Sequence, residues 1–210
     1  LGDSDALALA EDVQEMQDPS WIGLILANRS LREKDITGAL QRLETLRSTV
    51  PASNTSAHIQ IERLTGLAML QNGDYSGAKD AYLRLLDTDP DNIEVLNNLA
   101  YILSTHLDDP EAALPLAKQA ADRAPDSAEI LDTLGWTYYS VGDTENARAT
   151  LERSVQAREI PANTLHLGRI YLETGNSRRA RQLLERSIEL SEQAGDDETA
   201  DLARGFLKQL

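Results

Sequence analysis

The chain contains no cysteine among its 210 residues. Disulfide bonds and thiolate metal sites are therefore excluded, but the compartment stays open because cysteine-free proteins occur in the cytosol and in the periplasm. Aromatic residues make up only 4% of the chain, with a single phenylalanine. This composition favours helices rich in leucine and alanine over β-sheets.

Long apolar runs are also missing. The longest run covers residues 21–27, whereas a helix needs about 20 apolar residues to cross a bilayer. The sequence therefore predicts no membrane insertion. It begins at Leu1, without a methionine and partway through a helical pattern, which suggests a fragment of a longer protein.

Positive charge is scarce. Lysine and arginine number 20 against 35 acidic residues, which leaves a net charge of −15. Nonspecific binding to nucleic acid or to an anionic lipid surface requires a positive patch, so this balance opposes both. A basic protein partner remains compatible with it.

The clearest pattern lies in residues 127–156. Apolar and small residues recur there at i, i+3, i+4 and i+7, the spacing of one helix face. They are Leu131, Leu134, Gly135 and Tyr138. After a break at Gly142 and Asp143, a second stripe follows at Ala147, Leu151 and Ser154. We predict two short helices joined by a turn, with Gly135 and Ala147 allowing their axes to approach closely.

This pattern resembles the tetratricopeptide repeat family, whose signature is W-x2-L-G-x2-Y, then A-x3-F, then P, at a period of about 34 residues. Leu131 stands where the family often has tryptophan, and Leu151 where it has an aromatic residue. The closing proline is displaced to Pro161. The resemblance implies an all-α fold, a right-handed superhelical solenoid of antiparallel helix pairs.

The resemblance extends over nearly the whole chain. We expect one solenoid over residues 1–210, built from a half repeat at 5–18, repeats at 20–51, 59–90, 93–125, 128–160 and 161–194, and a capping helix at 196–210. This makes about twelve helices. Residues 52–57 lengthen one period as a loop or a helix extension, and Pro115 indicates a late helix start or a kink. In the capping helix, Leu202, Phe206 and Leu210 share one side.

Residues that could carry chemistry are few. The histidines, His58, His106 and His166, are expected in a loop, a turn and a helix, and none has metal-ligand spacing. No serine has a G-x-S-x-G context. The acidic clusters at 108–109 and 196–198 lack the calcium-loop pattern, so helix N-capping explains them more simply. We predict no enzymatic activity, no metal and no cofactor.

The remaining candidate for function is a surface. In the family that the sequence resembles, the first helices of successive repeats line a concave groove for extended peptides or partner helices. Glu129, Asp132, Trp136 and Tyr139 form a second stripe beside the core stripe, so Trp136 is expected to face this groove. In the 161–194 repeat the matching stripe is Ala162, Leu165, Arg169 and Leu172. The predicted partner-binding residues are Asn97, Tyr101, Glu129, Asp132, Trp136, Tyr139, Arg169 and Arg63.

Two interpretations of the aromatic residues stay open. Trp136 and Tyr101 either form an aromatic floor that touches a partner or fill the gap between adjacent repeats. The acidic neighbours of Trp136 predict a partner with apolar anchors and basic residues. A carboxylate clamp of the kind known in one subfamily is not expected, because Asp132 places an acid where the clamp needs a cation.

These patterns predict a noncatalytic scaffold for protein–protein interaction. Residues 97–127 and 131–143 resemble segments of large bacterial tetratricopeptide proteins, including ones linked to exopolysaccharide export and to protein sorting at the envelope. Two alternatives are a regulatory or targeting arm of a larger enzyme, such as a glycosyltransferase, and a structural solenoid that self-assembles through its exposed ends.

Overall fold

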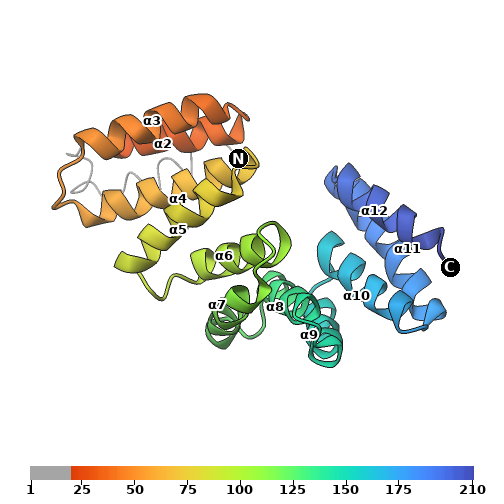
Figure 1. Ribbon diagram of the computed structural model, residues 1–210. Helices are drawn as coiled ribbons and strands as arrows, with labels where there is room; N and C mark the ends of the chain where they lie inside the picture. Colours follow the sequence, from red (N-terminus) through yellow and green to blue (C-terminus); the bar gives the residue numbers. More distant parts are fainter. Residues whose placement is uncertain (1–19) are drawn as a thin grey trace. The chain divides into compact units, whose positions relative to one another are not determined.

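The structure is a computed structural model that describes residues 20–210, so the expected half repeat at 5–18 lies outside the described residues. The described part contains eleven helices and no strand (Figure 1). The helices are α2 (Ser20–Arg32), α3 (Ile36–Thr49), α4 (Thr55–Gln71), α5 (Tyr75–Thr88), α6 (Ile93–Thr105), α7 (Pro110–Arg123), α8 (Ala128–Ser140), α9 (Thr144–Ala157), α10 (Pro161–Glu173), α11 (Ser177–Ala194) and α12 (Asp197–Leu207). Five helix pairs and a capping helix require this number, so the expected all-α repeat fold is confirmed.

Each helix pair packs mainly within itself, from α2 with α3 to α10 with α11. Short turns join the two members of a pair, which makes them antiparallel neighbours. The contacts divide the chain into two compact units, the first ending at Pro90 and the second beginning at Asp91. A continuous solenoid over the whole chain therefore stays a prediction.

The first unit places an ion-pair network where the repeat pattern has apolar residues. Glu62 on α4, whose side chain is 13% exposed, accepts from Arg47 on α3 and from Arg84 on α5. Thr65 accepts a bond of 3.2 Å from the same Arg47 and donates to the Ile61 carbonyl. These bonds satisfy two polar groups that would otherwise be costly to bury between helices.

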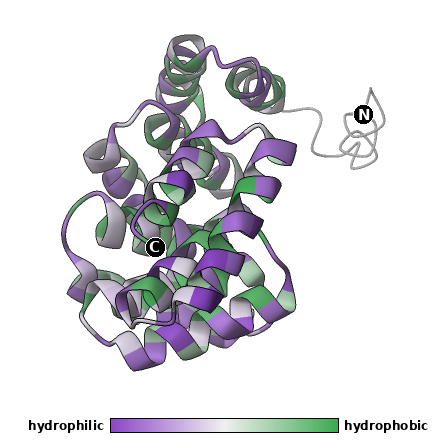
Figure 2. Ribbon diagram, turned by 90° about the vertical axis from the view of Figure 1, so that its right-hand side faces the viewer, coloured by the Kyte–Doolittle hydropathy of each residue, from purple (hydrophilic) through white to green (hydrophobic). Residues whose placement is uncertain are grey.

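In the second unit the first helices of successive repeats contact one another, α6 with α8 and α8 with α10, and α12 packs on α10 and α11. Figure 1 shows α7, α9 and α11 on the outer side of this row. Hydrophilic and hydrophobic residues alternate along the helices of the described part (Figure 2), as expected for amphipathic helices that bury one face.

The core of the repeat at residues 128–160 follows the predicted stripe. Leu134 and Leu151 are buried, and Ala147 has no exposed surface. A Cβ added to Gly135 would lie 2.6 Å from Cγ of Leu151, so glycine is needed for this helix approach. Tyr138 departs from the prediction, because it is only partly buried at the edge of the core.

Side-chain caps begin most of the helices. Asp109 accepts from the Ala112 amide at the start of α7, and Asp196 accepts from the Thr199 amide at the start of α12. Both satisfy an amide that has no partner inside the helix. N-capping is therefore confirmed for one aspartate in each acidic cluster.

The turns inside the helix pairs require a left-handed residue. Gly73, Gly142 and Gly175 fill this position with φ of 74°, 86° and 79°. Lys34 and Asp108 adopt the same region in the other two pairs, with φ of 62° and 51°. Only glycine adopts it without a steric cost from Cβ, so these two turns are strained.

Three expectations from the sequence need correction. Helix α4 begins at Thr55, so residues 55–57 are a helix extension and His58 is helical, not in a loop. Helix α7 begins at Pro110 and contains Pro115, so the late start was wrong. The capping helix α12 ends at Leu207, so Leu210 lies beyond the helix on which it was expected. The buried residues of α12 are Ala200 and Ala203, and Leu202 is 50% exposed.

Candidate functional site

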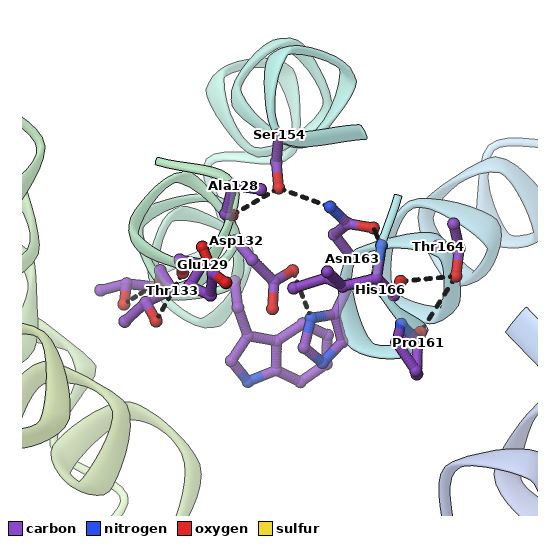
Figure 3. Close-up of polar contacts among 12 residues, drawn as sticks. Ala128, Glu129, Asp132, Thr133, Ser154, Pro161, Asn163, Thr164 and His166 are labelled. Atoms are coloured by element: carbon purple, nitrogen blue, oxygen red, sulfur yellow. Dashed lines mark hydrogen bonds and ion pairs between the residues drawn. The ribbon is translucent and has the colours of Figure 1, made fainter. Parts of the chain in front are cut away.

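A hydrogen bond joins α8 to α10 on the inner side of the second unit. Oδ1 of Asp132 lies 2.8 Å from Nδ1 of His166, and the two side chains are 10% and 18% exposed (Figure 3). The carboxylate fixes the orientation of the imidazole ring. The other ring nitrogen of His166 has no hydrogen-bond partner within residues 20–210.

Stacked rings extend from this pair. The ring of Trp136 lies parallel to that of His166, with centroids 4.2 Å apart and planes at 21°. It also stacks on Tyr139, at 5.0 Å and 28°. Because His166 comes from α10 and the other two rings from α8, the half-buried Trp136 fills the gap between the repeats and keeps part of its surface open.

One arginine lies among three aromatic rings. Cζ of Arg169 is 5.3 Å from the ring centroid of Trp136, 5.0 Å from that of Tyr139 and 5.5 Å from that of Phe206 on α12. These are distances at which a guanidinium is attracted to the face of a ring. We call Trp136, Tyr139, Arg169, Phe206 and His166 the Trp136 cluster.

Glu173 closes this cluster on one side. Its carboxylate accepts a bond of 2.7 Å from the Tyr139 hydroxyl and one of 3.0 Å from Nε of Arg169. Burial raises the pKa of Tyr139, and the hydrogen bond to Glu173 raises it further. The hydroxyl therefore stays a donor, which holds the tyrosine ring beside the arginine.

A buried polar network positions α10 against α8 and α9. The Ser154 hydroxyl donates to the carbonyl of Ala128 at 2.7 Å, and Nδ2 of Asn163 donates to Ser154 at 2.9 Å (Figure 3). Oδ1 of Asn163 accepts from the amide of Ile160 at the start of α10. Ser154 and Asn163 have no exposed surface, so water does not compete for these hydrogen bonds and they are stronger than bonds at the surface. The bonds fix the spacing of the helices that carry the cluster.

The structure brings four of the eight predicted site residues together. Asp132, Trp136, Tyr139 and Arg169 meet between α8 and α10. Glu129, one turn before Asp132, is exposed and pairs instead with Arg158.

The other three predicted residues lie on α6 and α4. Tyr101 on α6 is 37% exposed, and its ring meets that of His106 edge-on at 5.3 Å. Oδ1 of Asn97, also on α6, is buried without a hydrogen-bond partner. Arg63 lies on α4 of the first unit and donates to Gln60 at 3.0 Å.

The end of α6 and the start of α12 lie within electrostatic reach of each other. Burial lowers the pKa of His106, while the charge of Glu198 on α12 raises it. Beside Glu198, a shallow depression on α12 combines apolar and acidic groups. It is lined by Glu198, Asp201, Leu202, Gly205, Phe206 and Gln209.

Sequence reasoning missed His166, Glu173 and Phe206. In the expected stripe on α10, Leu165 is in fact buried, because it packs in a core with Leu184 and Ala203. The polar stripe consists of His166, Arg169 and Glu173, at i, i+3 and i+7. This spacing is visible in the sequence and was the available signal for two of the three residues.

The cluster offers stacking surface, a cation and carboxylates. His166 is held by a carboxylate, but within the described part of the chain neither serine nor lysine bonds to its ring. Residues 20–210 contain no group of three potential ligands that could hold a metal ion. No helix in the same range is both long and apolar enough for a membrane span.

Comparison with known proteins agrees with the geometry. Three family models, each described as tetratricopeptide repeat, match residues 64–92, 91–160 and 133–198. No curated protein sequence matches the chain.

Solved structures share the fold. A fragment of MamA from Desulfovibrio magneticus RS-1 is 20% identical, with a TM-score of 0.69 over 84% of this chain and 97% of that one. PilW, a type IV pilus biogenesis factor, is 18% identical, with a TM-score of 0.70 over 90% and 92%. A tetratricopeptide repeat protein of Thermus thermophilus is 18% identical, with a TM-score of 0.65 over 90% and 98%. Repeat pattern, helix pairing and family matches agree, and the chain belongs to the tetratricopeptide repeat family.

Proposed function

We propose that this chain is a noncatalytic scaffold for protein–protein interaction, and that the Trp136 cluster forms the centre of its binding surface in the second unit. The observation that carries the proposal is the position of the cluster. Its rings and its arginine come from α8, α10 and α12, so the cluster lies where the first helices of two successive repeats meet the capping helix. Tryptophan, tyrosine and arginine are the residues that most often dominate binding energy at protein interfaces.

The charge around the cluster supports a particular kind of partner. Glu173 lies beside the rings, and Glu198 and Asp201 border the depression on α12 where Leu202 is half exposed. The whole chain carries a net charge of −15. A segment with apolar side chains and basic residues complements the apolar and acidic groups of this surface.

Random-peptide display against the whole chain tests the proposal. We expect the selected peptides to combine apolar and basic residues, and Trp136→Ala to weaken their binding by about 2 kcal/mol or more. Leu83→Ala, at a residue 46% exposed on α5 of the first unit, is the matched control and should leave binding unchanged. If Trp136→Ala lowers stability and leaves peptide affinity intact, Trp136 is a packing residue and the binding surface lies elsewhere.

A second proposal, self-association, rests on a different observation. Helix α2 exposes three large apolar residues at i, i+3 and i+4, Ile22, Ile25 and Leu26, which are 64%, 45% and 40% exposed. A second copy of the chain would remove this surface from water. Sedimentation velocity over a dilution series should then show a dimer that Ile22→Lys abolishes, and a monomer at every concentration would contradict the proposal.

We also propose a place in a bacterial envelope assembly, from the resemblance of residues 97–127 and 131–143 to envelope-linked repeat proteins. Fractionation of the native cells tests this directly. The chain and its captured partner should be recovered together in the envelope fraction, and recovery of both in the cytosol would contradict the proposal.

A further inference from the structure

The arrangement around Arg169 has the form of an occupied binding site. A guanidinium lies about equally far from three ring centroids, at 5.0, 5.3 and 5.5 Å, on residues from two other helices. Glu173 supplies a carboxylate at 3.0 Å from Nε. Aromatic faces plus one carboxylate are the groups that recognise a cationic side chain or a quaternary ammonium ion.

The aromatic residues of this site are held in place by contacts that do not involve Arg169. Tyr139 is fixed by its hydroxyl bond to Glu173, and Trp136 by its stack on His166, whose ring is oriented by Asp132. Phe206 packs against the core between α10 and α12. Removing the Arg169 side chain would therefore leave a preformed cage.

Arg169 itself is only partly held. Its side chain is 34% exposed, and its hydrogen-bonded ion partner, Glu173, is 43% exposed. An ion pair of this exposure contributes little to stability, because solvent screens it. The side chain can therefore leave the rings at small cost when another cation replaces it.

We propose that Trp136, Tyr139, Phe206 and Glu173 form a cation-binding cage for an arginine or lysine side chain of the partner, and that Arg169 occupies it as a built-in competitor in the free protein. This inference rests on the proposed function, because it names the group of the partner that the surface recognises. Arg169 is attached to the same chain, so its effective concentration at the cage is high. A partner must supply additional contacts to displace it, which favours long segments over single basic residues.

The experiment measures the cage alone, with N-acetylarginine amide as the probe and N-acetylcitrulline amide as its neutral counterpart of similar shape. The signal is the indole ¹H–¹⁵N resonance of Trp136 in the whole chain, distinguished from that of Trp21 with Trp21→Phe. We expect Arg169→Ala to bind the arginine probe at least about fivefold more tightly than the unsubstituted chain, a gain within the range of cation–π contacts. The citrulline probe should cause no saturable shift.

Two further variants complete the test. Glu173→Gln in the Arg169→Ala background should weaken the arginine probe about threefold or more, because the carboxylate is lost. If Arg169→Ala does not fold by circular dichroism, Arg169→Met, which keeps an apolar stem on the rings, takes its place with the same expected gain. Equal affinity of variant and unsubstituted chain, or equal shifts with the two probes, overturns the proposal.

Failure here and failure of the proposed function remain distinguishable. The probe titration requires no partner, whereas the role of Trp136 in partner binding is measured with displayed peptides. If the displayed peptides lose affinity for Trp136→Ala but bind Arg169→Ala and the unsubstituted chain equally well, the scaffold function is supported and the cation-binding cage is excluded.

Discussion

Asp132 on α8 and His166 on α10 are 34 residues apart in the sequence and share a hydrogen bond of 2.8 Å. Both side chains are mostly buried, so each satisfies a polar group of the other. This bond links the first helices of two successive repeats and lies directly beside the ring of Trp136.

We therefore expect Asp132→Ala to lower the free energy of unfolding by about 1–3 kcal/mol, because it leaves the His166 ring nitrogen buried without its partner. Urea denaturation measures this loss. Glu129→Ala removes an exposed acid one turn earlier on the same helix and should change stability by less than about 0.5 kcal/mol. Equal effects of the two substitutions would show that the bond contributes nothing to joining the repeats.

Ala147 tests the helix packing. It has no exposed surface, so Ala147→Leu should overpack the contact between α8 and α9 and cost about 1–3 kcal/mol of unfolding free energy. Ala149→Leu, at an exposed position on the same helix, is the matched control and should be nearly neutral. An unchanged melting temperature for Ala147→Leu would refute the assigned repeat register.

The turn residues allow a test of backbone strain alone. A Cβ at Gly142 would meet nothing within 4 Å, so Gly142→Ala should cost about 1 kcal/mol purely through its φ of 86°. Lys34→Gly should act in the opposite sense and raise stability by up to about 1 kcal/mol, since Lys34 has a φ of 62°. Thermal unfolding of both variants checks the two signs, and a loss in both would mean that the Lys34 side chain contributes more than its strain costs.

The partial burial of His106 should make the stability of the folded chain depend on pH. Burial holds the pKa of His106 below its ordinary value of 6.5 in the folded chain, and Glu198 only partly offsets this. The unfolded chain therefore takes up the proton at a higher pH than the folded one. The contribution of His106 to the free energy of unfolding is fully present above pH 6.5. It is lost as the pH falls from 6.5 through the lower pKa of the folded state.

The corresponding measurement is unfolding in urea at about pH 7.5 and about pH 5. His106→Gln should show a smaller loss of stability between these two values than the unsubstituted chain. His58→Gln, on α4 of the first unit, serves as the control for an unrelated histidine. If His106→Gln and the unsubstituted chain lose the same stability, the burial of His106 is not a source of the pH dependence.

A substitution at Asn97 is expected to affect stability and peptide binding differently. Its Oδ1 is buried without a hydrogen-bond partner, so Asn97→Leu should leave stability unchanged or raise it by about 1 kcal/mol. If this oxygen accepts a bond from a bound peptide, the same substitution weakens the affinity of the displayed peptides. Unchanged affinity would exclude Asn97 from the peptide contacts, and lower stability would show that its side-chain amide is satisfied in the free protein.

The sequence by itself determined the repeat, its helix faces, its turns and its helix caps. Helix faces, breaks and caps depend on residues within one or two turns of one another. The sequence therefore predicted the helix pair from the spacing of Leu131, Gly135 and Ala147, and it predicted the N-caps of α7 and α12 from the acidic residues before them. The left-handed turns at Gly73, Gly142 and Gly175 follow from the same local pattern.

Only the tertiary structure decided which residues of successive repeats meet. A small rotation between neighbouring repeats selects the facing side chains, and no periodicity within one helix encodes that rotation. For this reason Asp132 faces His166, and Arg169 lies among the rings of Trp136, Tyr139 and Phe206. The repeat alignment had instead matched Leu165 to the position of Asp132, and Leu165 is buried in a core with Leu184 and Ala203.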